Sequence, residues 1–180
     1  NLLSINAKVN DEPFEVDALT LKYAGSGGIE GGEDLKERPK PLLVGRCFNV
    51  APILINAVDN VYQVHAYGPI HAVTKLYERG SDFDAETIAY AGDHATYAAL
   101  VAATITPGRW ATCLAQGLIR LGAPQAGVIT ADVDGDKGGG TWRNQAGAVI
   151  LRLCEIAGIT GALIETASFT ALDTALNALP

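Results

Sequence analysis

The sequence predicts an α+β fold, with short, mostly antiparallel strands in the first two thirds of the chain and helices packed on the sheet in the last third. Three observations lead to this prediction. The 180 residues include 20 glycines and 8 prolines, a content typical of many short elements joined by turns. Short apolar runs bounded by turn residues fill the middle of the chain, and two amphipathic helical stripes close it. Strands followed by helices in this order define the α+β class.

The first 41 residues differ in composition and hydrophobic pattern from the rest. Residues 1–23 alternate loosely around Phe14 and Val16, which predicts a strand with one solvent-facing side. Residues 24–41 are rich in glycine and then in charge, which predicts an extended loop. We therefore expect an N-terminal strand and loop over 1–41 and a main α+β domain over 42–180. The sequence has no methionine and begins at Asn1, so we interpret it as a fragment of a longer chain.

Six further strands are expected after residue 41. Four cover residues 42–48, 53–55, 61–66 and 70–77, and the last two resemble a hairpin around the turn Tyr67-Gly68-Pro69. Two more cover residues 110–121 and 128–133, joined by the turn GAPQAG. Residues 134–140 are expected to form a turn.

Three helices are expected. Asp93 is a suitable N-cap for the first, whose apolar face includes Tyr97 and Leu100. The second has a stripe predicted to pack on the sheet, with Arg152 and Glu155 off that face and Gly158 as a left-handed terminus. Its stripe comprises Ala146, Val149, Ile150, Leu153 and Ala157. The last has Thr166 or Ser168 as cap and a stripe of Phe169, Leu172, Leu176 and Leu179.

Composition excludes several classes of function. The net charge of −7 argues against a nucleic-acid backbone or an anionic membrane as main partner, because both attract clustered Lys and Arg. We therefore expect no direct nucleic-acid binding and no membrane insertion. Cys47, Cys113 and Cys154 are far apart and lack CxxC spacing, so they predict neither a disulfide framework nor a zinc site.

A run of alternating acids is the one weak candidate for a metal site. Asp132, Asp134 and Asp136 could direct three carboxylates at one hard cation such as calcium. An EF-hand loop counted from Asp132 would need Gly at position six and Glu at position twelve, where this chain has Lys137 and Arg143. A strand end running into a solvated turn is the favoured interpretation, and no cofactor is expected.

The histidines are the candidates for acid–base chemistry. His65 and His71 flank the Gly68-Pro69 turn and could approach each other, whereas His94 stands apart. The GxSxG motif is absent, and the glycine-rich stretches lack the order of a nucleotide-binding loop. Satisfied or solvent-facing histidines are the favoured interpretation, so we expect no catalytic residues and no enzyme activity.

Two stretches of sequence contain recognisable motifs. The first comprises KPLLVGRCFNVAPILI (40–55), YQVH (62–65), GPIHAV (68–73) and YERG (77–80). The second comprises residues 97–104, WATCLAQGLIRLG (110–122) and PQAGVITADVDG (124–135). Together they resemble tail proteins of tailed bacteriophages and prophages, of the baseplate-hub or tail-tip kind. The resemblance covers roughly Lys40 to Leu179, and its motifs are structural strings of strand and turn residues.

This resemblance implies a structural role in the virion tail, for a protein made in the bacterial cytoplasm. Its expected partners are other tail or baseplate proteins and copies of itself in a closed ring, with a trimer as the arrangement common at hubs. Two alternatives stay open. One is an enzyme domain that uses His65, His71 and the three aspartates Asp132, Asp134 and Asp136. The other is a calcium-stabilised module that binds a glycan.

Overall fold

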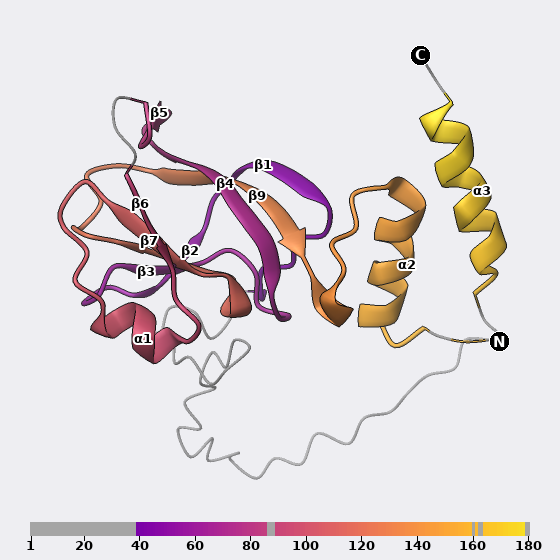
Figure 1. Cartoon of the computed structure of the whole chain (residues 1–180), viewed down its shortest axis with the longest axis horizontal. Helices are drawn as coiled ribbons and strands as arrows, with labels where there is room; N and C mark the ends of the chain where they lie inside the picture. The colour runs from indigo at the N-terminus through magenta and orange to yellow at the C-terminus, as the bar shows by residue number, and fades with distance from the viewer. Residues whose placement is uncertain (1–38, 86–88, 160, 162–163, 179–180) are drawn as a thin grey trace, which may run out of the picture.

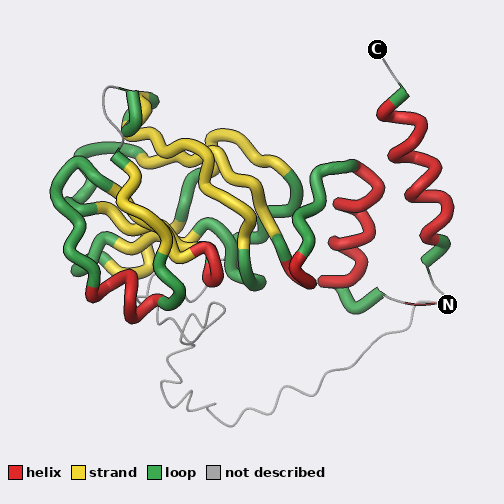
Figure 2. Tube along the Cα trace, in the orientation of Figure 1, coloured by secondary structure: helices red, strands yellow, loops and turns green. Residues whose placement is uncertain are grey.

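The computed structural model describes residues 39–85, 89–159, 161 and 164–178. The predicted strand over 1–23 and residues 24–38 of the predicted loop lie outside the described residues. The α+β class is confirmed: two β-sheets occupy the first part of the described chain, and the two longest helices follow them at its end (Figures 1 and 2).

The first sheet has four strands in the order β1-β9-β4-β5, all antiparallel. They are β1 (Arg46–Val50), β9 (Ile129–Asp136), β4 (Ile70–Glu78) and β5 (Ser81–Asp82). Strand β9 is central, because Val133 pairs with Cys47 of β1 on one side and with Val73 of β4 on the other. A central strand is held by hydrogen bonds along both edges, so side chains on β9 have fixed positions.

The second sheet has five strands in the order β2-β3-β8-β7-β6. They are β2 (Ile53–Asn56), β3 (Val61–Gln63), β8 (Leu118–Leu121), β7 (Trp110–Cys113) and β6 (Tyr90–Asp93). Strands β6 and β7 are parallel, and the others pair antiparallel. The parallel pair needs a crossover connection, which the helix α1 (Tyr97–Ala102) supplies.

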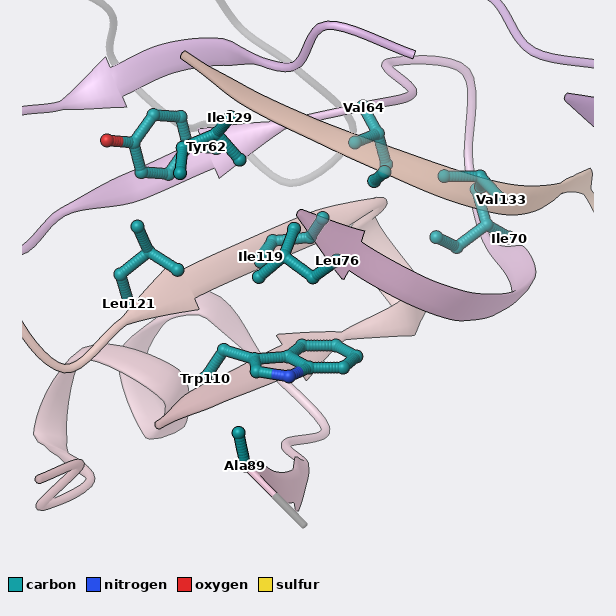
Figure 3. Packing of buried hydrophobic residues seen from close by; sticks show 11 residues of the cluster. Tyr62, Val64, Ile70, Leu76, Ala89, Trp110, Ile119, Leu121, Ile129 and Val133 are labelled. Carbon is teal, nitrogen blue, oxygen red and sulfur yellow. The ribbon is translucent and has the colours of Figure 1, made fainter. Parts of the chain in front are cut away.

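The main core lies between the two sheets (Figure 3). A smaller core lies under α1. Trp110 and Ile119 of the second sheet belong to the same buried cluster as Leu76 and Val133 of the first. Each buried apolar side chain contributes roughly 1.5–3 kcal/mol by leaving water, so this layer dominates the stability of the β-sheets.

The expected hairpin over residues 61–77 is wrong. Strand β3 pairs with β2 and β8, whereas β4 pairs with β9 and β5 in the other sheet. The first part of the connection between them, Val64 to Ala66, is buried. Its backbone bonds to other segments: the N–H of Val64 donates to Gly117 O, and the N–H of Ala66 donates to Pro41 O. These bonds carry the chain from one sheet to the other.

The expected strand over 110–121 is two strands, β7 and β8, separated by a helical turn at Leu114–Gln116. Gly117 ends that turn with φ of +63°, and a Cβ there would lie 2.4 Å from the carbonyl oxygen of His65. Glycine is required because the backbone is left-handed and another chain segment is in contact. The turn brings β8 back beside β7.

Two further expectations about element ends are wrong. Thr96, not Asp93, is the N-cap of α1, with its hydroxyl accepting from the N–H of Ala99. The Asp93 carboxylate instead accepts hydrogen bonds from the Thr112 hydroxyl and the Leu114 N–H. Strand β9 also continues through Asp136, where a turn was expected.

The helices α2 (Ala146–Ile156) and α3 (Thr166–Asn177) lie where helices are expected. The expected cap of α3 is wrong, because Glu165, and neither Thr166 nor Ser168, occupies the N-cap position. Gly158 ends α2 with φ of +77°, as predicted. The orientation of α2 is different from the prediction: Ile150 and Leu153 are 40% and 41% exposed, and Arg152 reaches β9. The reason is electrostatic, because a fully buried carboxylate on β9 needs a cation beside it.

Candidate functional site

Strand β9 carries Asp132, Asp134 and Asp136 on one face. Successive side chains of a strand point to opposite faces, so these three share a side and Ala131 and Val133 point into the core. All three carboxylates are buried. Because a buried charge is unfavourable unless it is paired, the partners of each carboxylate show what the site can do.

Asp132 is held by two hydrogen-bond donors. The Tyr77 hydroxyl of β4 donates to Oδ2 at 2.9 Å, and the N–H of Asn49 donates to Oδ1 at 2.9 Å. The hydrogen bond to this carboxylate raises the pKa of Tyr77 above its ordinary value. Asp132 therefore joins the two neighbours of β9.

Asp134 forms an ion pair with Arg46 of β1. The guanidinium donates from Nε at 2.7 Å and from Nη2 at 3.2 Å, a two-pronged arrangement that fixes both side chains. The same guanidinium lies 5.3 Å from the ring centre of Trp142. Trp142 stacks in turn on His71, with ring centres 4.8 Å apart and planes within 7°.

Asp136 has the most partners. Arg152 of α2 donates from Nε at 2.5 Å and from Nη2 at 3.2 Å, and the Gly138 N–H donates at 3.0 Å. Burial alone would raise the pKa of this carboxyl, but the Arg152 and Gly138 hydrogen bonds bring it below its ordinary value. The lowered pKa keeps Asp136 ionised, and the Arg152 guanidinium balances its charge. Arg152 also pairs with Glu155 at 3.1 Å.

His65 lies on the other side of Asp136, with Nε2 3.2 Å from the carboxylate and both side chains fully buried. Its Nδ1 accepts the Leu43 N–H at 3.0 Å. A nitrogen that accepts a hydrogen bond carries no proton, so the proton of the neutral ring is on Nε2, facing Asp136. Burial lowers the pKa of His65, which keeps the ring neutral.

The structure brings together one pair of predicted site residues, His65 and Asp136. His71 stacks on Trp142, and the backbone N–H of half-buried His94 donates to Thr112 O. Each aspartate has a different set of partners, and they share no common centre. Within the described residues, no group of three or more His, Cys, Asp or Glu side chains is placed to hold a metal ion.

Cys47, Cys113 and Cys154 are free thiols. Burial is the main cause that raises the pKa of both Cys47 and Cys113. A surface pocket of about 340 Å³ lies elsewhere, beside β4 and β5. It is lined by Glu78, Arg79, Ser81, Asp82, Phe83 and Ala126.

Comparisons with protein-family models, with curated proteins and with solved structures find no match for this chain. The described helices include none with the length and apolar character needed to cross a bilayer.

Sequence reasoning missed the cations that complete the site. Arg46 and Arg152 lie 88 and 16 positions from the aspartates that they bind, and no local spacing links them. The available signal was the strand alternation itself: three acids at every second position, beside apolar residues, predict a carboxylate row that needs cations if β9 is buried. Through their hydrogen bonds and ion pairs, the three aspartates connect β1, β4 and α2 to the central strand β9.

Proposed function

We propose that this chain is a structural component of a phage or prophage tail, of the hub, baseplate or tail-tip kind, and that it acts through protein–protein assembly. Its partners are other tail or baseplate proteins and further copies of the chain in a ring. It works in the virion tail after synthesis in the bacterial cytoplasm, and it is not an enzyme. The resemblance of residues 40–179 to tail proteins supports the tail assignment.

The observation that carries the assembly role is the apolar surface of the two C-terminal helices. Ile150 and Leu153 of α2 and Leu172 and Leu176 of α3 are each 37–43% exposed. Helices of a monomer bury such a stripe, whereas clusters of exposed large apolar residues mark interaction surfaces. The sheet region adds Phe48 and Val128, which are 67% and 70% exposed.

The geometry gives less support to either alternative. An enzyme needs titratable groups that meet in an accessible pocket, but His65 and Asp136 are sealed from solvent. A calcium-dependent module needs carboxylates that converge on one cation, but Asp132 and Asp134 already have separate donors within the fold.

Sedimentation velocity of the full chain over a range of concentrations tests the assembly role. We expect the wild-type chain to form a discrete oligomer, and we expect Leu153→Glu and Leu176→Glu to shift it toward monomer, because a charge at an apolar interface is desolvated without a partner. Val58→Glu is the matched control, since Val58 is 91% exposed and lies on the β2–β3 turn. A wild-type chain that stays monomeric at every concentration contradicts self-assembly.

A further inference from the structure

The helices α2 and α3 form a unit of their own. Among the described elements, α3 is the main packing partner of α2. The Asp173 carboxylate of α3 accepts hydrogen bonds from the N–H groups of Gly147 and Ala148, at 2.6 and 3.2 Å, which satisfies the first turn of α2. A Cβ on Gly147 would lie 2.4 Å from the Phe169 carbonyl oxygen, so the two backbones are in direct contact.

The β-sheets have a core that does not include this helical unit. Both buried apolar clusters, with the half-buried side chains packed on them, come from residues between Leu43 and Val133. The described residues of α2 and α3 contribute to neither cluster. Because apolar burial dominates folding, these two clusters can keep the sheets folded when the helices move.

Charged side chains bridge the joint between the two parts. Arg152 of α2 holds the buried Asp136, and Arg143 Nη1 donates to the Gly138 carbonyl at 3.0 Å. Val149 adds an apolar contact over Gly45. Trp142 stacks on His71. Asn144 and Gln145 are exposed and directly precede α2, which begins at Ala146, so the chain can turn at these two residues.

We propose that α2 and α3 form an arm that a charged latch, the Asp136–Arg152 pair, holds on the β-sheets, and that the arm leaves as one body when the latch opens. The β9 side of the latch stays in place, because the Asp136 N–H donates to Leu43 O and Asp136 pairs with Ile70 of β4. Two carboxylates, Asp136 and Glu155, face two guanidiniums, Arg152 and Arg143, so the closed latch is electrically balanced.

The arm carries the exposed apolar residues of α2 and α3, so opening the latch would reposition that surface without unfolding the sheets. A role for this movement in assembly rests on the proposed function, whereas the latch itself can be tested on the isolated chain.

Hydrogen exchange of the full chain, read segment by segment, tests the latch. Arg152→Met removes the charge and keeps the side-chain length, and Asp136→Asn removes the opposite charge and keeps the shape. Lys75→Met is the matched control, because Lys75 forms an ion pair with Asp82 at 3.0 Å that does not involve the arm. Trypsin adds a second reading, since it cleaves after Arg143 in the linker.

In both latch variants we expect exchange in α2 and α3 to rise by about tenfold or more, the range of local opening, while exchange in β4 and β9 is unchanged. Cleavage after Arg143 should accelerate and leave a folded β fragment. Two results would overturn the proposal: exchange that rises equally in β9 and α2, which makes the helices part of one cooperative unit, or exchange that rises in neither. The control should leave both regions unchanged.

Discussion

Acidification should destabilise the fold through His65. The folded chain holds this ring neutral, because burial lowers the pKa of His65 and its Nδ1 accepts the Leu43 N–H. In the unfolded chain the ring returns to its ordinary pKa of 6.5. Below that pH the unfolded state binds a proton that the folded state does not, so the free energy of unfolding falls as the pH falls.

The size of this effect follows from proton linkage. One proton bound only by the unfolded chain lowers the free energy of unfolding by up to about 1.4 kcal/mol for each pH unit below 6.5. The loss ends once the pH reaches the lowered pKa of the folded state. Asp136 does not change the free energy of unfolding in this pH range. Its pKa in the folded chain is lower than its ordinary value of 3.8, so the unfolded chain binds the extra proton only near that pH and below.

Urea unfolding at pH 7.5 and pH 5.5, followed by the fluorescence of the buried Trp110, measures the difference. His65→Asn keeps an acceptor near the Leu43 N–H but does not titrate, so its stability should lose this part of the pH dependence. His94→Asn keeps His65 and should keep the dependence. If His65→Asn shows the same pH dependence as the wild-type chain, His65 is not the buried neutral group described above.

Two further predictions concern a close backbone contact and metal. Gly117→Ala should lower the free energy of unfolding by about 1–3 kcal/mol more than Gly80→Ala does. Both glycines have positive φ, but only a Cβ at position 117 would collide with the carbonyl oxygen of His65. Equal losses of stability for the two variants in urea unfolding would refute the contact. Thermal midpoints with calcium and with excess chelator should agree, because each aspartate of β9 has its own donors; a drop of several degrees on chelation would show a bound metal that stabilises the fold.

Local sequence patterns predicted an element well where an apolar stripe on one face, or a residue at its end, is enough to identify it. The stripes at Leu153 and Leu176 predicted two helices, and Gly158 predicted the end of α2. Period and capping are local properties, so one sequence is enough to show them. The same stripes gave the wrong contact for Leu153, because periodicity shows that a face is apolar and does not show what covers it.

Strand pairing could not be predicted for a different reason. Whether β3 pairs with β4 or with β8 depends on where the buried link around His65 finds hydrogen-bond partners, and these are Gly117 and Pro41. The acids of β9 were found as candidates, but their burial depends on distant cations, Arg46 and Arg152. Contacts at such sequence separations leave no period in the sequence.

We propose that this chain works by assembly and that its charged residues stabilise the fold. Infectivity and composition of tailed particles that carry Asp134→Asn or Leu153→Glu test it most directly. Asp134→Asn keeps the shape of the Arg46 partner and should give assembled, infective particles, whereas Leu153→Glu, on the exposed apolar face, should deplete the chain from particles and lower infectivity. Fully assembled but non-infective particles with Asp134→Asn would contradict the account, because they would reveal a chemical or ligand-binding role for that carboxylate.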